Sequence, residues 1–173
     1  MDSEVRAIVH FQNCNKYGKS IFQSGSIEKL FNLRLNCELV LESIVAQIDE
    51  PSTNKRCFHV DGYTQSFKAF IYLNDVLNYC DQPFTVIPKS HKKYKFKIFL
   101  NILYNKINNN SITDLSILFS DRKSISFFGK AGTMILSNQL MAHKGYKQTT
   151  GKRRYVLIFY LTPKKYYQNR ILL

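Results

Sequence analysis

The sequence predicts a mainly β fold, a sandwich or barrel supported by helices near its N-terminal end. Apolar residues recur near helical spacing between residues 26 and 48, whereas from residue 56 onward short apolar runs alternate with turns rich in Gly, Pro and Asn. The 173 residues are 45% hydrophobic, with 13 Phe and 11 Tyr, which is enough to fill one core. Because no internal repeat or second domain is visible, we expect a single domain over 1–173.

The elements follow one another along the chain. Residues 1–25 are polar and broken by Asn, Gly and Ser, which predicts an irregular lead-in. Residues 26–48 are expected to form one or two helices, with Ser26 as N-cap and Pro51 ending the helical region. Strands are predicted, within a β core over 56–163, at 66–76, at the start of 84–93, twice in 124–140, and at 153–163. The segment 94–107 fits either helix or strand, and 164–173 is expected to be a tail.

Several classes of protein are excluded. The sequence has four cysteines with no C-x₂-C pair, which argues against a zinc ribbon or a disulfide framework: Cys14, Cys37, Cys57 and Cys80. We therefore expect these cysteines to behave as ordinary small apolar residues. No apolar run approaches the roughly 18 residues of a membrane span, and the first residues lack a signal-peptide pattern. We therefore expect a cytoplasmic protein with no membrane partner.

The net charge of +13 suggests an acidic partner such as nucleic acid or an acidic substrate. However, 18 of the 25 basic residues are Lys, and the chain has 14 Asn, a composition that AT-rich coding also produces. Arginine suits phosphate and base recognition better than lysine. We therefore expect a small-molecule substrate, with an acidic group compatible with the charge, rather than nucleic acid. The oligomeric state stays open.

The stretch "FHVDGYTQSFKAFIYLNDV" (58–76) contains a candidate metal pair. On a strand, residues i and i+2 point to the same face, so His59 and Asp61 can reach one ion. A second histidine would complete a two-histidine, one-carboxylate triad, the ligand set of non-haem Fe(II) oxygenases. The pair alone is weak evidence for a metal site, because a His-x-Asp or His-x-Glu sequence arises by chance in about one of four such chains. Lys68, later in this stretch, could face an acidic group, but we expect it to be an exposed strand lysine.

Three blocks in order resemble the phytanoyl-CoA dioxygenase-like family of Fe(II)/2-oxoglutarate oxygenases. The first is the stretch just quoted, which is similar to the family's FH-x-DG…YL-x-DV segment. The second is "QPFTVIPKSHKK" (82–93), and the third is "GKAGTMILSNQLMAHKGYKQTTGKRRYVLIFYL" (129–161). The resemblance implies a double-stranded β-helix (jelly-roll, cupin-like) with one or two N-terminal helices.

By this resemblance His59, Asp61 and His143 are the metal ligands and catalytic residues, and Arg154 binds the far carboxylate of 2-oxoglutarate. Arg154 lies eleven residues after His143, where the family places this arginine. Strand alternation alone leaves Arg153 as a competitor, because both faces of "RRYVLIFYL" are apolar. His91 is assigned to the turn after "VIP" and not to the metal.

The resemblance implies an enzyme, a dioxygenase that hydroxylates a small organic substrate with Fe(II), 2-oxoglutarate and O₂, with ascorbate as a supporting reductant. Halogenating relatives lack the carboxylate that Asp61 supplies, which favours hydroxylation. The chain departs from the family pattern at Lys89, where the family has Gly, and its N-terminal region is short. These departures motivate an alternative, a catalytically decayed jelly-roll that binds a metal or a partner. A nucleic-acid or protein oxygenase is disfavoured, because Tyr160 stands where nucleic-acid demethylases carry a second arginine.

Overall fold

The computed structural model describes residues 5–51, 57–146 and 151–171. Its elements, in chain order, are β1 (Val5–Ile8), α1 (Phe11–Cys14), α2 (Lys16–Ser24), α3 (Ser26–Leu35), β2 (Leu39–Asp49), β3 (Phe67–Tyr72), β4 (Phe84–Val86), α4 (Ser90–Lys93), α5 (Lys95–Ile107), the short 3₁₀ helix η1 (Asp121–Lys123), β5 (Ile125–Phe127), β6 (Met134–Asn138), β7 (His143–Gly145), β8 (Arg154–Pro163) and α6 (Lys164–Ile171). None of these described helices is long and apolar enough to cross a membrane.

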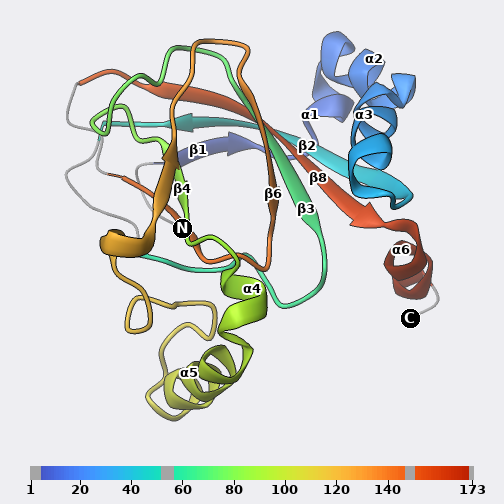
Figure 1. Ribbon diagram of the computed structural model, residues 1–173. Helices are drawn as coiled ribbons and strands as arrows, with labels where there is room; N and C mark the ends of the chain where they lie inside the picture. The colour runs from blue at the N-terminus through green and yellow to red at the C-terminus, as the bar shows by residue number, and fades with distance from the viewer. Residues whose placement is uncertain (1–4, 52–56, 147–150, 172–173) are drawn as a thin grey trace.

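Two antiparallel sheets form the body of the molecule (Figure 1). The larger sheet has the order β1-β2-β8-β3-β6, and the smaller one has the order β5-β4-β7. Apolar side chains from both sheets fill the space between them, among them Phe70, Tyr72, Phe84, Val156 and Ile158. This is the predicted jelly-roll, and the strands expected at 66–76, 84–93, 124–140 and 153–163 are confirmed.

Helices α1 to α3 cover the outer face of the large sheet beside β2 (Figure 1). Ile27 and Phe31 of α3 pack there against Leu41 and Ile44 of β2 and Phe159 of β8. Both faces of these strands are therefore buried, one by helices and one by the interior of the jelly-roll, which is why their sequences read as apolar on both sides.

The helix predicted over 26–48 is wrong beyond Leu35. Asn36 adopts a left-handed conformation (φ 47°) that ends α3, and β2 begins three residues later. The pairing of β2 with β8 shifts between Leu41 and Ser43, so a bulge breaks the two-residue alternation. Apolar residues before and after the bulge then recur at intervals that resemble helical spacing.

The two ends of the chain are also more ordered than the sequence predicts. The expected irregular lead-in over 1–25 contains β1, which extends the large sheet, and α1 and α2. Asn15 caps α2 by accepting hydrogen bonds from the backbone N–H groups of Tyr17 and Gly18. The tail over 164–173 forms α6 through Ile171, and the ambiguous segment 94–107 forms α5.

Candidate metal centre

The backbone brings His59 and His143 together although they lie 84 positions apart in the sequence. The N–H of each residue donates to the carbonyl of the other, at 3.0 and 2.9 Å, so the two form an antiparallel bridge. His143 belongs to β7, which pairs with β4 through Val86. Thr113 and Asp114 flank the other side of the 58–60 segment, since Val60 N–H donates to the Thr113 carbonyl and His59 bridges Asp114. The small sheet thereby continues outward across both histidines.

Both imidazoles are oriented in the same way. His59 Nδ1 lies 2.9 Å from the Cys57 carbonyl, and His143 Nδ1 lies 2.9 Å from the Met141 carbonyl, in each case two residues upstream. A carbonyl only accepts, so each ring carries a proton on Nδ1 and directs its Nε2 to the opposite side. This bond fixes ring orientation and raises the basicity of a metal-ligating nitrogen.

Asp61 completes the group. Its Oδ2 lies 3.2 Å from His143 Nε2, and one ligand atom from each of Asp61, His59 and His143 falls within 4.8 Å of the others. Burial by itself raises the pKa of Asp61, but the hydrogen bond with His143 and the charges of Lys68 and His143 outweigh it and hold that pKa well below its usual value. The carboxylate is therefore ionised at neutral pH.

Lys68 is the residue of this region that sequence reasoning misplaced. Its ammonium lies 2.5 Å from Asp61 Oδ2 and 4.9 Å from the centre of the Tyr160 ring, and only 7% of the residue is exposed. The expectation of an exposed lysine is thus wrong. The sequence did indicate that Lys68 is buried, because it lies on the same face of β3 as Phe70 and Tyr72, both of which point into the interior.

Arg154 and Arg153 point to opposite sides of β8. Arg154 shares the inner face with Val156 and is 8% exposed, whereas the Arg153 side chain is 52% exposed and pairs with Glu50 at 2.7 Å. Arg154 Nε and Nη2 contact Asp49 Oδ2 at 2.8 and 2.7 Å, and Asp49 is its register partner on β2. Nη1 donates to the Gln82 carbonyl. These contacts use three of the five guanidinium N–H groups.

The segment that follows β4 holds the backbone next to the metal ligand His143. Ser90 is fully buried, and its hydroxyl accepts a hydrogen bond of 2.8 Å from the backbone N–H of Ala142, the residue before His143. Lys89 occupies the position where the resembled family has Gly, and its φ of 59° lies in the left-handed region that favours glycine. His91, half-buried in α4, does not belong to the metal-ligand group.

The three donors suit a divalent first-row metal. Two imidazole nitrogens and one carboxylate oxygen on one side of an ion leave further coordination positions open, the arrangement of non-haem Fe(II) sites. Among the residues that the structure describes, this is the one group of three or more His, Cys, Asp and Glu side chains with such geometry. The four cysteines take no part in it. All four are free; Cys37 packs as a small apolar side chain against the core, whereas Cys14, Cys57 and Cys80 are exposed, and Cys57 contributes only its carbonyl.

No protein-family model and no curated protein sequence matches the chain. Solved structures do. HygX from Streptomyces hygroscopicus, in a structure with nickel and 2-oxoglutarate bound, matches with a TM-score of 0.69 at 16% identity over 94% of this chain and 71% of its own. The epimerase SnoN, a non-heme alpha ketoglutarate dependent enzyme from nogalamycin biosynthesis, matches with a TM-score of 0.70 at 13% identity over 92% and 63%.

The carbocyclase SnoK, from the same biosynthesis and with the same cofactor dependence, has a TM-score of 0.69 at 15% identity and covers 91% of this chain and 63% of its own. At these identities the likeness concerns the fold. The chain thus has the jelly-roll fold that these non-heme, 2-oxoglutarate-dependent enzymes also have.

Proposed function

We propose that the protein is an Fe(II)- and 2-oxoglutarate-dependent dioxygenase that hydroxylates a small organic substrate. The observation that carries the proposal is the convergence of two Nδ1-protonated imidazoles and an ionised carboxylate, from distant parts of the chain, on one point. When bound there, iron supplies the activation of O₂ coupled to decarboxylation of 2-oxoglutarate. His59, Asp61 and His143 hold the metal.

Arg154 is proposed to bind the far carboxylate of 2-oxoglutarate with the N–H groups that do not contact Asp49 or Gln82. Arg154 donates to Gln82, and Val86 pairs with His143, so the two ends are four residues apart along the chain, which is at most about 13 Å. A five-carbon diacid between a metal and a guanidinium covers about 10 Å, counting about 5 Å of carbon chain, about 2 Å of metal bond and about 3 Å of hydrogen bond. The comparable lengths support this role.

The interior between these two ends is apolar. Phe84 lies against Phe70 at 4.4 Å between ring centres and against the His143 ring at 5.4 Å. Such a lining excludes water and strengthens the attraction between a carboxylate and the Arg154 cation. HygX binds hygromycin B in one of its structures and SnoN binds nogalamycin RO in another, which is compatible with a small organic substrate for this chain.

The test is succinate release from 2-oxoglutarate by the protein with Fe(II), ascorbate and O₂, which requires no identified substrate because uncoupled turnover suffices. Arg154→Met is expected to raise the 2-oxoglutarate concentration needed for half-maximal release by at least tenfold, since a charge-assisted pair is lost. Arg153→Met, the neighbouring change on an exposed side chain, is the matched control and is expected to behave as wild type.

A second candidate is a metal- or partner-binding domain without turnover. The observation that favours it is the buried carboxylate of Asp49, which already neutralises Arg154 and so weakens its pull on another carboxylate. Absence of succinate from a folded, iron-loaded sample would favour this candidate over the dioxygenase.

A further inference from the structure

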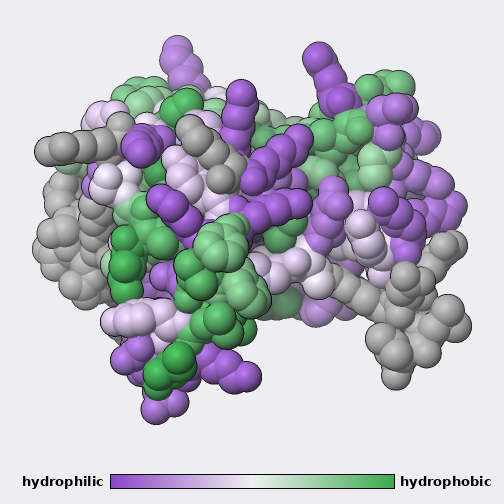
Figure 2. Space-filling view, turned by 60° about the horizontal axis from the view of Figure 1, so that its bottom comes forward, coloured by the Kyte–Doolittle hydropathy of each residue, from purple (hydrophilic) through white to green (hydrophobic). Residues whose placement is uncertain are grey.

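The apolar face of α5 points away from the protein. Six large side chains recur along it at helical spacing and are 43–80% exposed: Phe96, Phe99, Leu100, Leu103, Tyr104 and Ile107. We call these six the α5 stripe. Figure 2, in which the end carrying α5 is turned forward, shows apolar surface gathered in this region with hydrophilic side chains beside it. An exposed apolar patch of this kind marks an interaction site.

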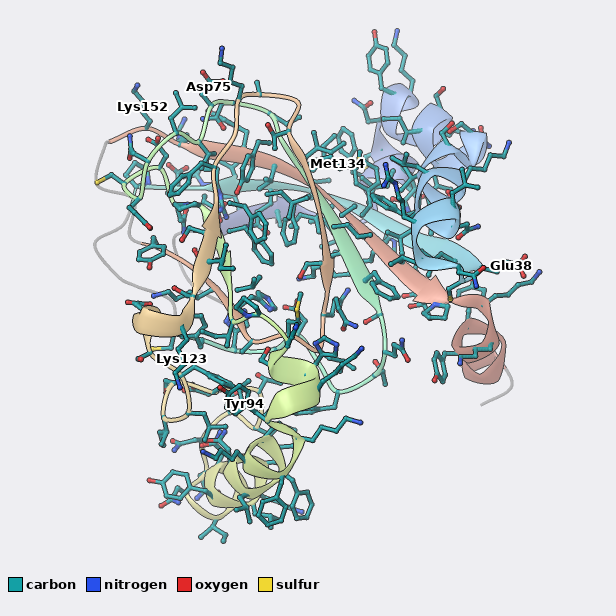
Figure 3. The ribbon with its side chains drawn as sticks, viewed as in Figure 1. Glu38, Asp75, Tyr94, Lys123, Met134 and Lys152 are labelled. Atoms are coloured by element: carbon teal, nitrogen blue, oxygen red, sulfur yellow. The ribbon has the colours of Figure 1, made fainter. Side chains whose placement is uncertain are left out.

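The inner face of α5 combines Ile98, which packs in the core, with two asparagines whose hydrogen bonds fix the helix in this orientation. Asn101 donates to the Asp114 carbonyl at 2.7 Å, and Asn105 donates to the carbonyls of Asp114 and Ser111 at 2.8 and 3.0 Å. Both asparagines are buried. Turning the stripe inward would break three buried hydrogen bonds, each costly to leave unmade. These hydrogen bonds therefore keep the α5 stripe facing outward. Figure 3 shows side chains projecting from the outer side of α5.

The charge around the stripe is of one sign. Between residues 89 and 110 the sequence has six lysines and no Asp or Glu. Lys95, Lys97 and Lys106 are exposed on α5 itself, and Lys89 and Lys92 are exposed in the turn and short helix before it. A second copy of the chain would bring these cations face to face, which opposes association. The complementary partner is an anionic surface with an apolar layer beneath it.

We propose that α5 docks on a membrane surface that contains anionic lipids. The α5 stripe enters the interface between headgroups and acyl chains, and the lysines bind the negative headgroups, as in helices that lie flat on bilayers. The sequence-based expectation of no membrane partner rested on the lack of a spanning segment, which a surface helix does not need. Asp114, which anchors α5, also bridges His59, so docking places the metal centre at the membrane-facing end of the molecule. The inference does not depend on the proposed activity.

The experiment is co-sedimentation of the full chain with vesicles of phosphatidylcholine alone and of phosphatidylcholine mixed with phosphatidylserine. Binding is expected to the mixed vesicles only, and to weaken as salt is added. The double variant Phe96→Gln/Phe99→Gln is expected to bind about a hundredfold more weakly, because two ring insertions are lost. Leu33→Gln, which changes an 87% exposed leucine on α3, is the matched control and should bind as wild type.

The charge component has its own pair of variants. Lys95→Gln/Lys97→Gln is expected to weaken binding about thirtyfold, from about 1 kcal/mol for each lysine near an anionic surface. Lys19→Gln/Lys29→Gln, which removes two exposed lysines of α2 and α3, should leave binding unchanged. Circular dichroism melting checks that each variant is folded.

Four results would overturn the proposal. One is the lack of binding to either kind of vesicle, and another is equal binding by wild type and the Phe96→Gln/Phe99→Gln variant. The third is concentration-dependent self-association that this variant abolishes, which would assign the stripe to a second copy of the chain. Retention by an acidic protein surface in place of vesicles would likewise reject the lipid assignment.

Discussion

Replacing Lys68 by Met is expected to tighten the binding of a divalent metal. The Lys68 ammonium lies 2.5 Å from Asp61 Oδ2, so an ion bonded to that oxygen at about 2.1 Å would lie no more than about 4.6 Å from the ammonium. At that distance Coulomb's law gives a repulsion of about 7 kcal/mol at an effective dielectric constant near 20, and of about 2 kcal/mol in bulk water. Because Lys68 is buried, water does not fully screen the repulsion between its ammonium and the metal ion. The side chain of Lys68 is flexible, so the ammonium can move away from the ion, which reduces the repulsion.

We therefore expect the Lys68→Met variant to bind Mn²⁺ about tenfold to a hundredfold more tightly, or about 1.4 to 2.7 kcal/mol. Asp61 stays ionised in this variant at neutral pH, because an ordinary aspartate pKa is about 3.9. The assay is calorimetric titration of the metal-free protein. Lys164→Met, which removes a surface pair with Glu38 at 2.8 Å, is the control and should not change the affinity. Weaker metal binding by Lys68→Met would refute the reasoning and assign Lys68 a supporting role at the metal.

Three further predictions concern stability and co-substrate. The free energy of unfolding of the metal-free protein should fall as the pH drops below about 4, because the pKa of Asp61 is depressed in the folded state, and Asp61→Asn should flatten this acid limb in urea titrations. Tyr72→Phe should cost about 2–4 kcal/mol in urea unfolding, because the Tyr72 hydroxyl donates to Phe127 O and accepts from Phe84 N inside the core; a cost below about 0.5 kcal/mol would contradict those bonds. Asp49→Asn should lower the melting temperature yet enlarge its rise on adding 2-oxoglutarate, and an unchanged rise would argue against the far-carboxylate site.

The central features of the site could be predicted from the sequence because they depend on local patterns. His59 and Asp61 are two residues apart on an extended segment, and the segment around His143 keeps the flanks that the resemblance requires. The backbone bridge between the two histidines then follows from the jelly-roll topology. What the pattern could not supply was the direction of the arginines, since both faces of β8 are apolar; the structure puts Arg154 on the inner face.

Other features escaped the sequence because they depend on contacts between distant segments. The bulge in β2 made a strand resemble a helix, and the pairing of Asp49 with Arg154 joins residues on neighbouring strands far apart in sequence. In α5 the usual rule is largely inverted, because buried asparagines bond to backbone carbonyls while most of the large apolar residues face outward. Periodicity predicts that an apolar stripe exists, and only the fold tells which way it points.

The measurement that tests the account most directly is a crystal structure of the protein grown with Mn²⁺ or, without oxygen, with Fe²⁺. The account predicts one ion bonded to His59 Nε2, His143 Nε2 and an Asp61 oxygen, each at about 2.0–2.2 Å. An ion that contacts fewer than these three side chains, or that binds elsewhere while the three stay in place without it, would contradict it.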